Sequence, residues 1–268
     1  MKKISTLRAA MLVLLVLSLL SPPMAAASKD KGGAVLEVLY LGNDYVQDPE
    51  SGAWIDYNHF IIEALESSRS MEVNVEFRWP GEKGYVSTEL SFDPYDVVIF
   101  SEVWSSHFNE GQIDDLVSFV EDGGGFIMFG GFGGFGGRDE YGEWGGTPIE
   151  DILPVEITSN EDAVDEDTEM VYVHKQRDHP LLHGVNLNDA PVLHGYNDVE
   201  ASGAGTVIAV NSANDAPLLT VGEYGEGRVV AFASNPAGGW GVDFVEWNKY
   251  DRFLTNMVSW AANIPERK

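Results

Sequence analysis

The sequence predicts an α/β fold with a mainly parallel sheet and a second half that is richer in strands. Three observations support this. Short apolar runs, typical of strands buried on both faces, alternate with segments of helical period. The chain has 268 residues, 44% of them hydrophobic, which suffices for one large core. No repeat of roughly 20 to 50 residues is visible, so we do not expect a solenoid or propeller.

The first half supplies the parallel strands. Ala34–Leu41 is a mostly apolar run that predicts a buried strand, and Trp54–Ser67 has the spacing of a helix. Val73–Trp79 alternates with the period of a strand, and Tyr95–Phe100 predicts a second buried strand.

Asn109–Glu121 is the clearest helix. Asn109 can cap it, Gln112 can complete a capping box, and apolar residues recur at i, i+3, i+4 and i+7. Gly123–Gly125 ends the helix, and Phe126–Phe129 predicts the next strand. Strands joined by helices indicate a parallel sheet with right-handed connections.

The second half contains a hairpin and a long final helix. Thr147–Glu150 predicts the start of a short helix capped by Thr147. Leu218–Val221 and Arg228–Ala233 flank a turn and predict a hairpin, and Asp243–Ala262 predicts the last helix. No Pro- or Ser-rich linker divides the chain, so we expect one domain.

The N-terminus has the order of a secretory signal peptide. Basic residues precede the apolar run Ala9–Leu20, and Ala25–Ala27 offers a small-residue cleavage site. The run is too short to span a bilayer comfortably. We therefore expect a signal peptide at residues 1–27, a short linker at 28–33 and one domain at 34–264. The mature protein would be secreted or periplasmic, without stable membrane insertion.

Charge and cysteine content exclude several function classes. Acidic residues number 43 and basic residues 16, a formal net charge of -27, which disfavours nucleic acid and anionic membranes as partners. The chain has no cysteine, so disulfides, thiolate catalysis and cysteine-ligated metals are impossible.

Several motifs together resemble a known family. They are the turn FIMFGGFGG at Phe126–Gly134, the segment TPIEDILP at Thr147–Pro154 and the segment YGEGRVVAFASNPAGGWG at Tyr224–Gly241. In this order they resemble the putative glutamine amidotransferase domain family, within the class I glutamine amidotransferase-like superfamily, and are similar to trehalose-utilisation type domains. The resemblance covers most of residues 34–264. It implies a flavodoxin-like three-layer sandwich with a mainly parallel sheet and β-rich additions in the second half.

The same resemblance shows where the chemistry of the family is missing. A class I amidotransferase carries a cysteine nucleophile on a tight strand–turn–helix elbow, completed by a histidine and a glutamate. Here the elbow falls near Gly131 or Phe132 in the glycine-rich stretch Gly130–Gly137, which has no cysteine, serine or threonine. We therefore predict no glutaminase activity, and the family name indicates the fold.

The glycine-rich stretch is the main candidate for ligand binding. It does not follow the first strand, as a dinucleotide loop would, so no cofactor is expected. A wide turn would instead bring backbone amides to the carboxyl edge of the sheet, where α/β proteins usually bind ligands. The loop that follows Val229–Ala233 should face the same edge. The candidate ligand-binding residues are Gly131, Phe132, Gly133, Trp144, His194, Asn197, Asn235 and Trp240, and packing of the loop alone is the alternative.

Other polar clusters carry weaker hypotheses. Asp139, Glu140 and Glu143 could supply a glycosidase carboxylate pair, although a solvated loop explains them better. The histidines His174, His179, His183 and His194 match no strong metal pattern, and the acidic run Glu161–Glu169 lacks the central glycine of a calcium loop. We predict no metal site and expect the acidic run to be a solvated or mobile loop.

These observations predict an exported, catalytically degenerate amidotransferase-like protein that binds a small polar ligand, with carbohydrates among the candidates. Two alternatives stay open. One is a hydrolase of the same fold using carboxylate or histidine chemistry. The other is a protein-interaction module without a small-molecule site.

Overall fold

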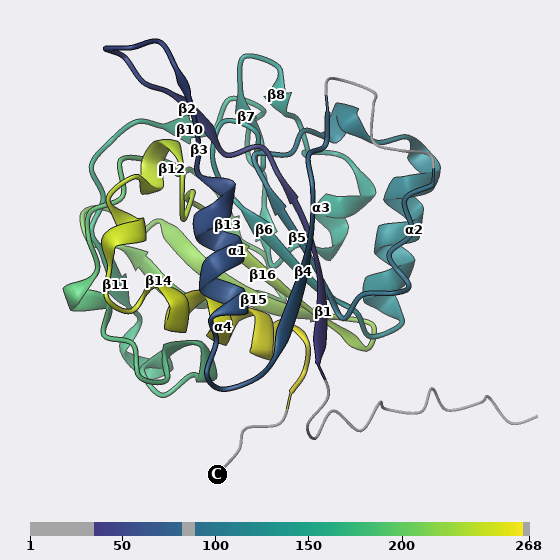
Figure 1. Cartoon of the computed structure of the whole chain (residues 1–268). Helices are drawn as coiled ribbons and strands as arrows, with labels where there is room; N and C mark the ends of the chain where they lie inside the picture. The colour runs from purple at the N-terminus through teal and green to yellow at the C-terminus, as the bar shows by residue number, and fades with distance from the viewer. Residues whose placement is uncertain (1–34, 82–88, 265–268) are drawn as a thin grey trace, which may run out of the picture. The chain divides into compact units, whose positions relative to one another are not determined.

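The computed structural model describes residues 35–81 and 89–264. The expected signal peptide (1–27) and linker (28–33) lie outside the described residues, and the domain limits 34 and 264 stay a prediction. The described chain is organised around an eight-stranded sheet with the order β11-β14-β15-β16-β6-β5-β1-β4 (Figure 1).

One half of the sheet is parallel. It consists of β4 (Val73–Arg78), β1 (Leu36–Gly42), β5 (Val97–Ser101), β6 (Gly125–Phe129) and β16 (Gly227–Phe232), each parallel to its neighbours in this series. Every residue of β5 and β6 is buried, which explains why both segments are continuous apolar runs. The second strand of the series in sequence lies outside the first, which is the flavodoxin-like order. The predicted fold class is confirmed.

The other half of the sheet is antiparallel. β16 pairs with β15 (Pro217–Tyr224), which pairs with β14 (Thr206–Asn211), which in turn pairs with β11 (Met170–Tyr172). The predicted hairpin is therefore present, and β16 joins the two halves.

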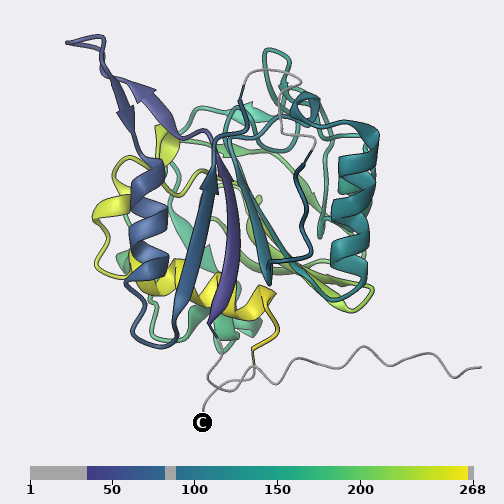
Figure 2. The same cartoon turned by 45° about the vertical axis from the view of Figure 1, so that its right-hand side comes forward.

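Helices cover both faces of the sheet and form the outer layers (Figure 2). α1 (Asn58–Glu66) and α4 (Tyr250–Ala261) pack together on one face, over a core that includes Val38, Ile99 and Phe129. α2 (Glu110–Glu121) and α3 (Pro148–Ile152) pack on the other face. The alternation of side chains along each strand divides the core into these two clusters.

Short elements connect these layers. Small two-stranded pairs are formed by β2 (Tyr45–Gln47) with β3 (Trp54–Asp56), β7 (Gly137–Arg138) with β8 (Tyr141–Gly142), β9 (Val155–Glu156) with β13 (Glu200–Ala201), and β10 (Ala163–Val164) with β12 (Tyr196–Asn197). Single-turn helices are η1 (Ser105–His107), η2 (His174–Gln176), η3 (Pro180–Leu182), η4 (Leu187–Asp189), η5 (Gly239–Gly241) and η6 (Phe244–Glu246).

Helix ends show where sequence patterns succeed and fail. α2 is capped as predicted, with the Gln112 amide donating to Asn109 and the Gln112 side chain accepting from the Asn109 amide. The helix predicted from Trp54 begins only at Asn58, because Trp54–Asp56 pairs with β2 in a projecting hairpin. Thr147 does not cap α3, since its hydroxyl donates to the Trp144 carbonyl instead.

The final helix is shorter than predicted. It begins at Tyr250 rather than Asp243, and the preceding residues form η6 followed by a turn through Trp247. Within the part of the chain that the structure describes, no helix is long and apolar enough to cross a membrane.

Candidate functional site

Four parallel strands end side by side at one edge of the sheet. Their carboxyl ends lead into Asp44 after β1, Glu102 after β5, Gly131 after β6 and Asn235 after β16. Because the strands are parallel neighbours, residues far apart in sequence meet there. This edge is where ligands usually bind in open α/β sheets.

Asp44 is buried in a network of hydrogen-bond donors. Its carboxylate accepts from the Tyr40 hydroxyl at 2.6 Å and from Asn235 Nδ2 at 2.6 Å. The Tyr40 hydroxyl also lies 2.9 Å from Oδ1 of Asn58, the first residue of α1. Burial raises the pKa of Asp44, although these hydrogen bonds oppose the rise.

Glu102 is partly buried and lies in the left-handed region, with a φ of 54°. Its Oε2 accepts from the Gly133 amide at 2.6 Å, and its Oε1 accepts from Asn235 Nδ2 at 3.1 Å. The same Nδ2 donates to Asp44, so one amide group bridges two carboxyl groups. Burial, and then the negative charge of Asp44, raise the pKa of Glu102 to about 7.

Glu102 also occupies the space above Gly131. Gly131 has a φ of 132°, and a Cβ atom there would overlap the Glu102 carboxylate. This is one of the two positions at which the family resemblance places the nucleophile. Any side chain at residue 131 would have to displace the Glu102 carboxyl group.

A second buried carboxylate holds the glycine-rich turn from behind. Asp162 accepts from the amides of Gly136 at 2.9 Å and Gly137 at 2.8 Å, and from Asn197 Nδ2 at 2.7 Å. Asn197 also accepts from the Gly131 amide at 2.9 Å. Burial raises the pKa of Asp162 to about 6. These contacts fix the turn that presents Gly131 and Gly133 to Glu102.

Aromatic side chains lie in front of the turn. Phe132 is 41% exposed, packs edge-on against Trp240 at 5.7 Å, and carries the Arg138 guanidinium 4.4 Å above its ring. Tyr141, 42% exposed, lies 4.4 Å from the Trp104 ring. Phe132 and Tyr141 are therefore exposed aromatic side chains in and just after the glycine-rich stretch.

The acidic run Glu161–Glu169 is exposed at all of its acidic residues except Asp162, yet several of its carboxylates bind other parts of the chain. Asp165 accepts from Trp240 Nε1 at 2.8 Å and pairs with Arg138 at 2.6 Å. Asp167 and Asp243 flank the His194 ring at 2.8 Å and 3.0 Å and raise its pKa. The run fastens the loop around Trp240 to the glycine-rich turn.

The structure brings only some of the predicted site residues together. Gly131, Gly133 and Asn235 surround Glu102, and Phe132 lies on the exposed side. Asn197 is fully buried behind the turn, and its amide donates to backbone oxygens and Asp162. Trp240 and His194 instead bind carboxylates of the acidic run, Asp165 and Asp167 respectively.

Trp144 requires a correction. It is fully buried, its Nε1 donates to the Val103 carbonyl at 2.8 Å, and its ring packs against Phe100 and Phe108. A side chain sealed in the core offers no stacking face to a ligand. Phe135, which belongs to the glycine-rich stretch, is equally buried.

The sequence analysis did not select Asp44, Glu102, Tyr40 or Asp162. A usable signal existed for two of them, since Asp44 and Glu102 follow buried strands almost directly, and polar residues at such strand ends meet at one edge. Asp162 carried no such signal, because nothing in the sequence distinguishes it from the other acidic residues of Glu161–Glu169.

The remaining polar clusters do not converge. Asp139, Glu140 and Glu143 have φ values of 53°, 67° and 51° in and just after the β7–β8 turn, as expected for a solvated hairpin. His194 binds two carboxylates, and His179 accepts from its own turn. Across residues 35–81 and 89–264, no group of three or more metal-ligating side chains is placed to hold an ion.

Comparisons with known proteins agree with this fold. Two cytoplasmic proteins from Salmonella typhimurium are similar in structure, each with a TM-score of 0.72 over 84% of this chain and 99% of theirs, at 24% and 21% identity. A ThuA-like protein from Parabacteroides merdae is also similar, with a TM-score of 0.57 and 14% identity over 88% of this chain and 92% of that one. At these identities the likeness concerns the fold alone. No curated protein matches the sequence.

The family assignment rests on the sequence itself. Residues 50–263 match the family described as putative glutamine amidotransferase. This range includes Glu102, the glycine-rich turn and Asn235, whereas Asp44 precedes it. The predicted resemblance is confirmed, and the chain contains no cysteine. The chain belongs to the putative glutamine amidotransferase family.

Proposed function

We propose that this protein binds a small polar ligand at the carboxyl edge of its sheet and has no glutaminase activity. The observation that carries the proposal is the position of Glu102. Its carboxyl group fills the space that a side chain at Gly131 would need. The edge thus presents a protonatable acid where the family places a nucleophile.

The absence of cysteine supports the second part of this proposal, the lack of glutaminase activity. Class I amidotransferases attack glutamine with a thiolate, and this chain has no thiol. The Asn235 amide nearby donates to both Asp44 and Glu102, and Asp44 also accepts from the Tyr40 hydroxyl. Purified protein should release no ammonia from glutamine, and release above a buffer blank would refute this part.

The chemistry at the edge favours a ligand rich in hydroxyl groups. Glu102 can accept hydrogen bonds when ionised and donate one when protonated, and both forms coexist near pH 7. The exposed rings of Phe132 and Tyr141 offer apolar faces of the kind that stack on sugar rings. A Cβ at Gly133 would contact the Trp104 ring, so Trp104 lies beside the amide that binds Glu102. A carbohydrate offers both hydroxyl groups for Glu102 and an apolar ring face for the aromatic side chains.

A thermal-shift screen of neutral sugars, sugar acids and amino acids tests the binding proposal. We expect a saturable rise in melting temperature with a sugar-type ligand. The apparent affinity derived from this rise should fall at least tenfold in Glu102→Gln and in Phe132→Ala. The matched control is Glu226→Gln. Glu226 is an exposed carboxylate in the turn between β15 and β16, at the opposite edge of the sheet. A hit that Glu102→Gln and Phe132→Ala leave unchanged would place the ligand elsewhere.

We also propose that the protein is exported and acts in a secreted or periplasmic location. The support is the charged, apolar and small-residue order of residues 1–27. Expression of the full chain followed by cell fractionation tests this. Recovery of a shortened protein outside the cytoplasm is expected, and a full-length protein confined to the cytoplasm would contradict it.

A second candidate is a hydrolase that uses carboxyl groups. The pKa of Glu102 near 7 suits a general acid. Asp44 lies close to it, because Asn235 Nδ2 donates to both carboxyl groups. Nitrophenyl glycosides provide the assay. This candidate would be favoured if Glu102→Gln and Asp44→Asn both lose turnover while at least one of the two variants still binds sugar. Binding without turnover by the unaltered protein would favour the first.

A further inference from the structure

Among the residues that the structure describes, some basic side chains form ion pairs and others do not. Arg78, Arg138 and Arg228 each pair with a carboxylate, at 2.6 Å, 2.6 Å and 3.6 Å. Arg69, Lys249 and Arg252 make no ion pair with any residue that the structure describes. In a chain of net charge -27, three unpaired cations close together are an unusual concentration of positive charge.

These three cations line one cavity of about 510 Å³. It lies between the turn that follows α1 and the first turn of α4, two helices that pack together. Serine, asparagine and threonine side chains complete the lining, and Asp251 is its one carboxylate. The lining residues are Ser67, Ser68, Arg69, Ser70, Gly184, Asn248, Lys249, Asp251, Arg252 and Thr255.

The start of α4 adds further positive potential to this cavity. Lys249 is the N-cap residue, and its side chain does not cap the helix. The amides of Tyr250 and Phe253 bond to Trp247 and Lys249, whereas those of Asp251 and Arg252 have no partner among the described residues. A helix N-terminus with free amides attracts anions. The N-terminus of α4 and the three cations therefore both attract anions to this cavity.

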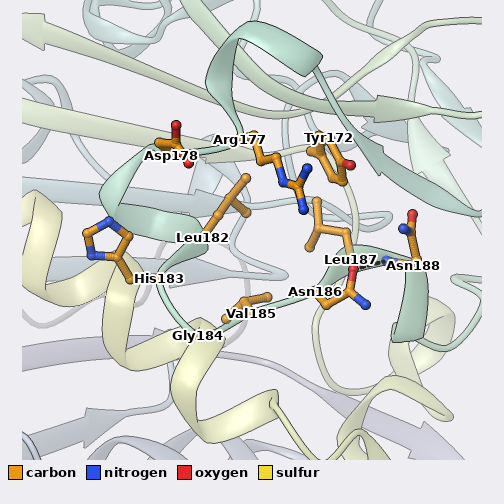
Figure 3. A pocket seen from close by; sticks show the side chains of 10 residues that line it. All are labelled: Tyr172, Arg177, Asp178, Leu182, His183, Gly184, Val185, Asn186, Leu187 and Asn188. Atoms are coloured by element: carbon orange, nitrogen blue, oxygen red, sulfur yellow. Dashed lines mark hydrogen bonds between the residues drawn. The ribbon is translucent and has the colours of Figure 1, made fainter.

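A second cavity of about 440 Å³ shares the lining residue Gly184 with the first. Its apolar side chains Leu182, Val185 and Leu187 lie among polar groups, with Asn186 and Asn188 on one side (Figure 3). Asp178 is the carboxylate in its lining. Arg177 also lines it and lies 5.6 Å above the Tyr172 ring, again without an ion pair among the described residues. This cavity could hold the uncharged part of a ligand whose anionic group binds next door.

We propose that the two cavities together bind a small organic phosphate. The phosphate group lies among Arg69, Lys249, Arg252 and the free amides of α4, and the organic part extends past Gly184 towards Tyr172 and Arg177. Arginine offers paired N–H donors that match phosphate oxygens, and serine hydroxyls supply further donors. α1 connects this site to the carboxyl edge, because it starts at Asn58 beside Asp44 and ends next to the cavity. The site is independent of the proposed ligand at Glu102.

Isothermal titration of the full mature protein with inorganic phosphate and with phenyl phosphate tests this proposal. Both should bind saturably, and phenyl phosphate should bind several-fold more tightly because its ring enters the second cavity. Arg69→Gln/Arg252→Gln should weaken both at least tenfold. Both side chains are exposed, so the variant should retain its fold, which its melting temperature verifies.

Two further variants separate this site from general charge attraction. Lys175→Gln removes an exposed cation that lines neither cavity, and it should change neither affinity. Arg177→Gln should weaken phenyl phosphate more than inorganic phosphate. The absence of saturable binding of either probe up to about 10 mM would overturn the proposal. Equal losses in Lys175→Gln and Arg69→Gln/Arg252→Gln would overturn it too.

Discussion

Asp162 and Glu102 both bind amides of the glycine-rich turn, yet their surroundings differ. Asp162 is buried and accepts from two backbone amides and the Asn197 side chain. Glu102 is partly exposed, accepts from one amide and one side chain, and faces the charge of Asp44. Burial raises the pKa of both carboxyl groups, to about 6 for Asp162 and to about 7 for Glu102, where the charge of Asp44 adds to the rise. The comparison teaches that the carboxyl group with more donors fixes the turn, whereas fewer donors and a neighbouring carboxyl group leave Glu102 with the higher pKa and an exposed side.

The largest expected effect belongs to Asp162. Asp162→Ala would leave the buried amides of Gly136 and Gly137 without acceptors, and each such loss costs about 1–3 kcal/mol. We expect a loss of about 3–5 kcal/mol in the free energy of unfolding, measured by urea denaturation at pH 7. Glu102→Ala should cost less than half as much at the same pH, because it also removes the repulsion with Asp44. Equal costs would show that the two carboxyl groups do not differ in the way described.

A smaller effect is expected from filling the space at Gly131. Gly131→Ala places a methyl group against the Glu102 carboxylate at a φ of 132°, so it should cost about 2–4 kcal/mol. Removing the carboxylate with Glu102→Ala should restore about 1–2 kcal/mol of that loss in the double variant. Strictly additive losses would mean that the two residues do not compete for space.

The next effect concerns pH. The raised pKa of Glu102 means that the folded protein holds its proton above the pH at which the unfolded chain releases it. Its contribution to stability therefore falls as pH rises from about 4.5 to about 7. Glu102→Gln lacks this fall, so its stability relative to the unaltered protein should improve by about 2–3 kcal/mol across that window. Glu226→Gln, exposed at the opposite edge, should show no such trend.

The smallest effect belongs to His194. Its pKa is raised by Asp167 and Asp243, so its contribution is fully present below about pH 6.5 and is lost as pH rises through the raised value. Because the side chain is 36% exposed, solvent screens both pairs, and His194→Gln should cost less than about 1 kcal/mol at pH 6 and almost nothing at pH 9. Melting temperatures at the two pH values provide the check. An equal cost at both would assign the effect to packing instead.

Much of the fold could be predicted because burial leaves a direct trace in the sequence. β5 and β6 are buried at every position, and α2 carries a complete capping box. The errors occur where tertiary contacts decide. Trp54 and Ile55 are spaced like the start of a helix, yet pairing with Tyr45–Gln47 makes them a strand.

The candidate site was only half predictable. Glycines at a strand end predict a turn at the sheet edge, and Gly131 and Gly133 lie there. The decisive carboxylates were hidden among 43 acidic residues, because the sequence does not tell which few of them tertiary packing buries. Trp144 was misplaced for the opposite reason, since only the packing of Phe100 and Phe108 around it shows that it is core.

Carbon-13 NMR titration of the glutamate side-chain carboxyl signals tests the central claim most directly, with Glu102→Gln identifying the Glu102 resonance. A titration midpoint near 7 for that signal is the result that this structure predicts. A midpoint near 4.5, the ordinary value of an exposed glutamate, would contradict the claim that Glu102 is a protonatable acid at the carboxyl edge of the sheet.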